Sequence, residues 1–228
     1  MCSSDLHGGH RARMKQRYLS QGLDGFSDHE ALELLLYYAI PRADVNPLAH
    51  RLLDHFGSLH AVLDAEVAEL TEVAGVGEST ALLLRYVRDM NRRYLLDGQE
   101  KRPRLADAAA AGKLFLPYFY GIREERVYAA FLDDDLRLLR CRLLFEGGIN
   151  YAPLSVRKLV EAALREKATG VVLAHNHPAG QAIPSVEDRE ATLQIRSALE
   201  AMQIRLLDHI IVAGEEYISM EECGHFRR

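Results

Sequence analysis

Two histidines one residue apart, His175 and His177, close an apolar run in the stretch LAHNHPAGQAIPSVED, and Asp188 follows eleven residues later. Residues i and i+2 of a strand point to the same face, so both imidazoles would project together from the end of GVVLA. Pro178 would end that strand because it has no N–H for the ladder. Two histidines, one carboxylate and a water make a known catalytic zinc arrangement. The spacing therefore predicts zinc bound by His175, His177 and Asp188.

The same residues have simpler structural interpretations. A single histidine in an apolar context is usually a hydrogen-bonded structural residue. The stretch SVED also fits a helix start, with Ser185 as N-cap and acidic residues in the first turn. The combination H-x-H-P, six residues, then S-x-x-D is long and specific, and it favours the metal site.

This pattern resembles the JAMM motif of the JAB/MPN metalloprotease superfamily. The flanking stretches AHNHPAG, PSVED and LLDHIIVAGEEYISM are similar to those of the RadC family, once described as DNA repair proteins. GHRARM, ELLLYYAIPRADVNPLAHRLLDHFGSL and VAGVGES extend the resemblance to nearly the whole chain. It implies an α/β/α JAB/MPN domain of cytidine-deaminase-like fold that binds zinc and hydrolyses peptide or isopeptide bonds.

The resemblance also implies a glutamate that acts as general base. Glu125 lies seven residues before Leu132 and eight before Asp133, as the family pattern requires, so it is preferred to the neighbouring Glu124. Such a carboxylate would take a proton from water and deliver it to the leaving nitrogen. Taken without the resemblance, a glutamate that opens a strand is usually solvated. At a second position, where many RadC proteins carry a glutamate, this chain has Lys158.

Two further features of the site remain open in the sequence. Ser185 matches the superfamily serine that stabilises the tetrahedral oxyanion, and it could also only cap the helix. Asp208 and His209 alternate faces on a strand, so at most one faces the metal. A hydrogen bond from one of them to a ligand histidine would orient that ligand, but the residues alone favour a buried structural pair.

The motif residues must be positioned by an α/β half. A helix is expected in ADAAAAGKLFLPYF, strands in ERVYAAFLD and LRLLRCRLLF, and an amphipathic helix in LSVRKLVEAALREK. The buried strand GVVLAHNH, the helix SVEDREATLQIRSALEAM and the strand IRLLDHIIVAG follow. We therefore expect an α/β fold with a mixed sheet over residues 101–228.

The first hundred residues read as helices. DHEALELLLYYAI has Asp28 as a plausible cap, and NPLAHRLLDHF has Asn46 as N-cap and ends at Gly57. VAGVG, at 73–77, resembles the turn of a helix-hairpin-helix, whose backbone amides can approach a phosphate. The polar stretch DGQEKRPRL suggests a linker, so we expect an all-α domain over 1–100 and the JAB/MPN domain over 101–228.

DNA binding by the helical half is the main alternative function. Arg85, Arg88 and Arg92 recur at i, i+3 and i+7 and would form a basic stripe. A second basic cluster consists of Arg11, Arg13, Lys15 and Arg17. Against this, the net charge is −5, Glu78 follows the glycine turn, and a solvated helix face is the simpler interpretation.

Composition limits the remaining classes. No apolar run approaches the ~20 residues of a membrane span, and the basic N-terminal stretch has no apolar segment typical of a signal peptide. The three scattered cysteines fit a reducing cytoplasm rather than a disulfide framework. An HNH nuclease is disfavoured because these histidines end an apolar strand. We expect a cytoplasmic zinc metallopeptidase with an unidentified substrate; the alternative is a DNA-binding repair accessory protein whose metal-binding domain is a non-catalytic scaffold.

Overall fold

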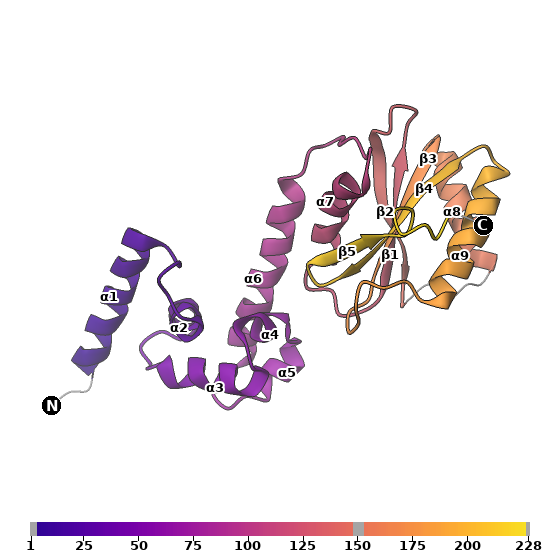
Figure 1. Cartoon of the computed structure of the whole chain (residues 1–228). Coiled ribbons are helices and arrows are strands. Elements are labelled where there is room, and N and C mark those ends of the chain that lie inside the picture. Colours follow the sequence, from indigo (N-terminus) through magenta and orange to yellow (C-terminus); the bar gives the residue numbers. More distant parts are fainter. Residues whose placement is uncertain (1–3, 148–152, 227–228) are drawn as a thin grey trace. The chain divides into compact units, whose positions relative to one another are not determined.

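The computed structural model describes residues 4–147 and 153–226 (Figure 1). The chain divides into two units, Met1–Asn91 and Arg92–Arg228, and the division falls within helix α6 (Glu78–Asp97). The described part of the first unit is helical, and the second contains a mixed sheet with helices. The predicted α/β fold class with a helical first part is confirmed.

The helical unit is assembled around one apolar core that includes Leu32, Leu36, Leu52 and Leu84, all fully buried. Its helices before α6 are α1 (Ser4–Gln21), α2 (Asp28–Ala39), α3 (Asn46–Phe56), α4 (Leu59–Asp64) and α5 (Val67–Thr71).

The helix caps differ by one residue from the sequence expectations. Ser27, not Asp28, is the N-cap of α2, because the Glu30 carboxylate three positions later accepts a hydrogen bond from the Ser27 N–H at 2.9 Å. Val45, not Asn46, is the N-cap of α3. Gly57 ends α3 as predicted, in the left-handed conformation that glycine adopts without strain.

The second unit contains a five-stranded sheet of order β2-β1-β3-β4-β5. Strands β3 and β4 are parallel, and the other neighbours are antiparallel. The elements are α7 (Ala108–Phe119), β1 (Arg126–Leu132), β2 (Leu138–Glu146), α8 (Pro153–Arg165), β3 (Gly170–Asn176), α9 (Val186–Glu200), β4 (Arg205–Ala213) and β5 (Glu216–Ser219). The sequence analysis did not predict β5 as a strand.

Helices cover both faces of this sheet (Figure 1). Helix α7 packs on one face against alternate strand residues that include Tyr128, Val172 and Ile210. Helices α8 and α9 pack on the other face, where the apolar core includes Phe131 and Leu173. Residues of one parity in β3 therefore face α7, and those of the other parity face α8 and α9.

Among the described residues, no helix combines the length and the apolar character needed to cross a membrane.

Candidate metal centre

Strand β3 presents the two histidines. Val171 and Leu173 belong to the core on the α8 and α9 face, so the period of two places His175 and His177 on that face as well. His175 is almost fully buried, with 3% of its surface exposed, and His177 is partly buried because the strand has just ended. Burial of the first histidine limits its rotation and so fixes the direction of its ring nitrogens.

The start of α9 brings Asp188 to the same place. Ser185 is the N-cap of α9, and its Oγ accepts a hydrogen bond from the Asp188 N–H at 2.9 Å. The Asp188 carboxylate in turn accepts from the Ser185 N–H at 2.8 Å, which completes a capping box. The prediction that Ser185 caps this helix is confirmed, and the same cap orients the carboxylate.

The three side chains converge on one point. Nε2 of His175 lies 2.9 Å from Nε2 of His177 and 3.2 Å from Oδ1 of Asp188. Nε2 of His177 lies 3.4 Å from Oδ2 of Asp188. Ligand atoms of a tetrahedral zinc site, each ~2.0–2.1 Å from the ion, are about 3.3 Å apart. The spacing of this cluster therefore fits a metal ion of that size, and the group of His175, His177 and Asp188 could hold one.

The hydrogen bond of His177 fixes its tautomer. Its Nδ1 lies 3.0 Å from the carbonyl oxygen of Gln181, in the loop after β3. A carbonyl oxygen only accepts, so the proton must be on Nδ1. The Nε2 atom of His177 then carries a lone pair, which faces the other two side chains of the cluster.

His175 is oriented by a chain of three buried hydrogen bonds. The Thr192 hydroxyl donates to the Asp188 carbonyl oxygen at 2.6 Å, so its oxygen accepts from Nδ1 of His209 at 2.7 Å. Nε2 of His209 therefore has no proton, and it accepts from Nδ1 of His175 at 2.8 Å. Like His177, His175 is left with a lone pair on Nε2. These tautomers are those that metal coordination requires.

Burial and hydrogen bonding shift the pKa values of His209 and Asp188. Desolvation holds the pKa of the fully buried His209 well below its ordinary value, so its ring is neutral. Burial opposes ionisation of Asp188, but the adjacent His175 ring and the hydrogen bond from the Ser185 N–H outweigh it and hold the pKa of Asp188 below its usual range. The cluster thus combines one carboxylate with two nitrogen lone pairs.

Asp208 and His209 are both buried, and the His209 N–H donates to the Asp208 carboxylate at 2.7 Å, but His209 also bonds the candidate ligand His175. The His209 imidazole bonds His175 and Thr192, whereas the Asp208 carboxylate accepts from the Ser219 hydroxyl at 2.6 Å and from the Glu221 N–H at 3.1 Å. Burial raises the pKa of Asp208. Asp208 thus links β4 to β5, and the His209 ring contacts the candidate ligand His175.

Glu125 lies outside this cluster of ligand atoms, but the sheet register aligns it with the cluster. Val127 of β1 is paired with His175 of β3, so two residues further along each strand Glu125 is level with His177. Opposite residues of antiparallel strands share a face, so the side chain of Glu125 belongs to the histidine face. Glu125 is exposed, and its carbonyl oxygen accepts from Gly147 N–H at 2.8 Å.

Asn176 fixes the backbone on both sides of Glu125. Its Oδ1 accepts from the Arg126 N–H at 2.7 Å, and its Nδ2 donates to the Glu124 carbonyl oxygen at 3.0 Å. By the same alternation, Glu124 belongs to the opposite face, where its carboxylate lies 3.9 Å from the Arg126 guanidinium. The geometry thus distinguishes two neighbouring glutamates that the sequence pattern leaves as alternatives.

Lys158 lies away from the cluster. Its ammonium group donates to the carbonyl oxygen of Leu144 at 2.6 Å and lies 5.0 Å from the centre of the Phe145 ring. Lys158, which replaces the glutamate of the family pattern, thus links α8 to β2.

The proposed basic stripe of α6 is not an open surface. Arg88 is buried and contacts the Asp89 carboxylate at 3.0 Å, and Arg85 is paired with Glu66. Arg92 donates to the carbonyl oxygen of Tyr118 at 3.2 Å. The expectation that the three arginines form one basic surface was wrong, because helical spacing alone does not show which face packs on the core.

The N-terminal basic residues are also largely engaged. Arg11 donates to the Ile40 carbonyl oxygen at 2.9 Å and lies over the Tyr37 ring. Arg17 is paired with the Glu30 carboxylate at 2.7 Å. Lys15 and Arg13 are exposed on α1. In the turn between α5 and α6, Gly75 has the left-handed conformation. This conformation by itself does not indicate DNA binding.

Comparison with protein families matches both parts of the chain. A family model described as RadC-like JAB domain matches residues 105–225, more than half of the chain. A second model, described as UPF0758 N-terminal, matches residues 9–82. The matched JAB region contains every residue of the metal cluster described above.

Sequence reasoning missed Thr192 and the orienting role of Asn176. A usable signal for Thr192 was its position four residues after Asp188, because a helical threonine often bonds the carbonyl oxygen four residues before it. No comparable local signal exists for Asn176, whose partners lie about fifty residues earlier in the chain.

Proposed function

The chain belongs to the RadC family of JAB-domain proteins, and from this premise we propose that it is a zinc-dependent hydrolase of peptide or isopeptide bonds. The observation that carries the proposal is the convergence of Nε2 of His175, Nε2 of His177 and the Asp188 carboxylate at 2.9–3.4 Å. In this arrangement His175, His177 and Asp188 would hold the zinc. A bound zinc ion would polarise the substrate carbonyl and lower the pKa of a water molecule toward ~7.

Both proton transfers of the reaction would be carried out by Glu125. Glu125, level with His177 on the histidine face, would accept the proton of the attacking water as its oxygen bonds to the substrate carbonyl carbon. It would then deliver that proton to the nitrogen as the C–N bond breaks. Glu125 is the preferred base, since Glu124 belongs to the other face.

Ser185 can both cap α9 and assist the reaction. Capping uses a lone pair of its oxygen, which accepts from the Asp188 N–H. The hydroxyl proton is not consumed by this bond, so it remains free to donate to the oxygen of the tetrahedral intermediate. The two roles assigned to Ser185 are therefore compatible.

A direct test is metal analysis of the purified full-length protein, followed by hydrolysis assays with peptide and isopeptide libraries. We expect about one zinc per chain in the wild type, and loss of zinc in His175→Ala and His177→Ala while the helical unit stays folded. Glu125→Gln should keep its zinc and lose ~10²–10⁴-fold in hydrolysis, because an amide cannot accept the proton. Glu124→Gln is the matched control and should retain activity.

Other results would overturn the proposal. Wild-type protein without bound zinc would remove the enzymatic function. Bound zinc with no hydrolysis of either library would favour the alternative, a non-catalytic metal-binding scaffold of a DNA-associated protein. Full activity of Glu125→Gln with loss in Glu124→Gln would exchange the roles of the two glutamates.

A further inference from the structure

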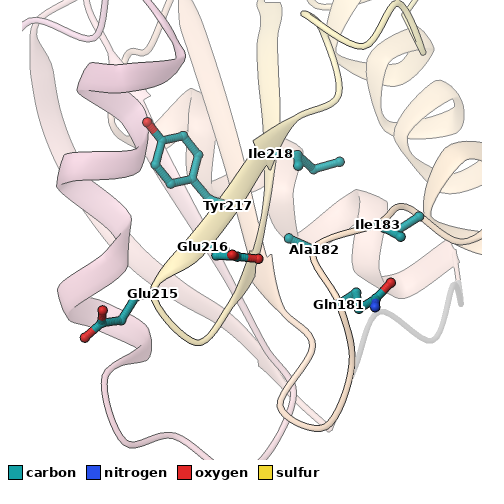
Figure 2. Close-up of a pocket in the computed structure, with 7 residues that line it drawn as sticks. All are labelled: Gln181, Ala182, Ile183, Glu215, Glu216, Tyr217 and Ile218. Atoms are coloured by element: carbon teal, nitrogen blue, oxygen red, sulfur yellow. The ribbon is translucent and has the colours of Figure 1, made fainter.

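A groove lies beside the metal cluster, between the loop after β3 and the hairpin formed by β4 and β5. Its volume is about 500 Å³, and it is lined by residues 181–183 of the loop and 215–218 of the hairpin. Figure 2 shows Ala182 and Ile183 on the loop opposite Ile218 of β5. Ile183 and Glu216 are both exposed, so the groove offers an apolar wall and a carboxylate to solvent.

One residue that lines the groove, Gln181, also contacts the metal cluster. The Gln181 carbonyl oxygen, at one end of its loop wall, is the acceptor that fixes the His177 ring at 3.0 Å. Along the sheet, His175 is paired with Ile211, and Ile211 with Ile218. Side chains in such a row share a face, so Ile218 is on the histidine face of the sheet.

Glu216 lies in the next row of the same face. The pairing of Asn176 with Val212 places His177 level with Ala213 one step further on, and Ala213 is paired with Glu216. Glu216 and Ile218 are thus two residues apart on one side of β5, and both are directed toward the cluster side of the sheet. A chain that crossed this surface would meet a carboxylate and an apolar side chain at strand spacing.

Strand β5, which lines the groove, is an edge strand of the sheet among the described residues. Met220 N–H donates to the His209 carbonyl oxygen, and in an antiparallel pair such bonded positions alternate with positions whose backbone groups point outward. The N–H and C=O of Tyr217 are therefore outward. The Tyr217 ring lies on the opposite face, where a Cβ on Gly112 of α7 would come within 2.3 Å of it. Figure 2 shows the Tyr217 ring directed away from the loop of residues 181–183, so we assign the contribution of Tyr217 to the groove to its backbone.

We propose that this groove binds an extended peptide segment of the substrate, added to the edge of β5, with an apolar and a basic side chain two residues apart. The apolar side chain would pack on Ile218 and Ile183, and the basic one would pair with Glu216. The Tyr217 backbone would supply the strand hydrogen bonds. The inference rests on the proposed function, because it assigns the substrate of that hydrolase to a class: peptides with an apolar-x-basic segment.

The test measures binding without hydrolysis. Fluorescein-labelled nonapeptides with a central Leu-x-Lys or Leu-x-Glu segment are titrated against zinc-loaded, full-length Glu125→Gln protein, and fluorescence anisotropy is recorded at low salt. We expect the lysine peptide to bind about fivefold more tightly, the upper range for one exposed ion pair. A set of lysine peptides N-methylated at successive backbone positions should include a member that binds at least about fivefold more weakly, since one backbone hydrogen bond is lost.

Charge exchange provides the decisive control. Glu216→Lys should reverse the preference and favour the glutamate peptide, while Glu72→Lys, a matched change in the helical unit, should leave it unchanged. Equal affinity for both peptides, or a preference unaffected by Glu216→Lys, overturns the groove proposal. Selective binding with no hydrolysis by the wild type would support the groove while the proposed function fails; hydrolysis without selective binding would overturn the groove alone.

Discussion

Nδ1 of His175 lies 2.8 Å from Nε2 of His209, and this buried contact determines which nitrogen of His175 is free to bind a metal. The Asp188 carbonyl oxygen can only accept a hydrogen bond, and this sets which atom donates in each of the next two bonds, at Thr192 and His209. In this relay of hydrogen bonds from Thr192 through His209 to His175, burial keeps the middle residue His209 neutral. The contribution of the relay should therefore be geometric, and it should appear in metal affinity.

Thr192→Val should weaken zinc binding by about 10–100-fold, the usual effect of losing an outer hydrogen bond to a ligand histidine. Without the Thr192 oxygen, His209 can move its proton to Nε2, and His175 must then carry its own proton on the metal-facing nitrogen. Competition with a chromophoric chelator measures the affinity, and ¹⁵N shifts of the imidazoles in metal-free protein report the tautomers.

Thr169→Val is the matched control for that experiment. The Thr169 hydroxyl is buried and has no hydrogen-bond partner in the described part of the chain. Its removal should leave zinc affinity unchanged and should be neutral or slightly stabilising, because an unsatisfied buried hydroxyl costs about 1–3 kcal/mol. Thr192→Ser should restore the wild-type affinity. An unaltered affinity in Thr192→Val would show that the relay does not orient His175.

Asn176→Asp should lower hydrolysis while zinc remains bound. A carboxylate cannot donate to the Glu124 carbonyl oxygen, so the backbone that carries Glu125 would lose one of its two attachments to Asn176. A displacement of the base by about 1 Å can cost ~10²-fold in rate. The measurement is kcat of Asn176→Asp, of Glu125→Gln and of the double variant. If Asn176 acts through Glu125, the effect of Asn176→Asp should vanish in the Glu125→Gln background; additive losses would contradict this role.

Arg88→Glu should destabilise the helical unit rather than report on DNA binding. Arg88 is 4% exposed, so the substitution would replace a buried cation with a buried anion beside the acidic Asp89. Asp89 itself is 56% exposed, so the cost would come from the glutamate at position 88, and an uncompensated buried charge typically costs ~3–5 kcal/mol. Urea denaturation followed by helical circular dichroism measures the loss. Arg88→Met, which keeps most of the packing, should be far milder, and equal stability of the two variants would show that the charge is not buried.

The pairing of Arg17 with Glu30 should make the helical unit sensitive to acid. Hydrogen bonds from Arg17 and from the Ser27 backbone lower the pKa of Glu30 to about 2. Because the folded pKa is below the unfolded one, this stabilisation is present above the unfolded value of about 4.3 and is lost as the pH falls toward 2.

The difference in unfolding free energy between wild type and Glu30→Gln should therefore be constant above about pH 5 and shrink as the pH falls to 2. Urea titrations at several pH values measure it, with Glu72→Gln as the surface control. A difference that does not change over this range would mean that the pair contributes nothing to folding.

The parts that follow from local pattern are predictable from the sequence. The alternation of apolar residues in β3 is enough to place His175 and His177 on one face, and Gly57 ends α3 as its position indicates. Ser185 and Asp188 follow from a capping pattern only four residues long. In each case the residues that decide the geometry are neighbours in the chain.

The parts that depend on distant neighbours are not predictable in the same way. His209 reaches His175 only because β4 lies parallel and adjacent to β3, and Arg88 is buried only because one side of α6 packs on the helical core. Strand β5 has four residues, too few to show a period, and it follows a tight turn at Gly214. Periodicity describes a segment but does not identify the segment beside it.

Three groups of Asp188 belong to three separate structures. Its carboxylate belongs to the metal cluster, its N–H to the helix cap at Ser185, and its C=O to the relay through Thr192. The cap and the relay already hold the first turn of α9, and filling the site would add a third restraint through the carboxylate. Amide hydrogen exchange in that turn should then depend on metal occupancy more than exchange elsewhere along α9, so the backbone of this helix would report whether the metal site is filled.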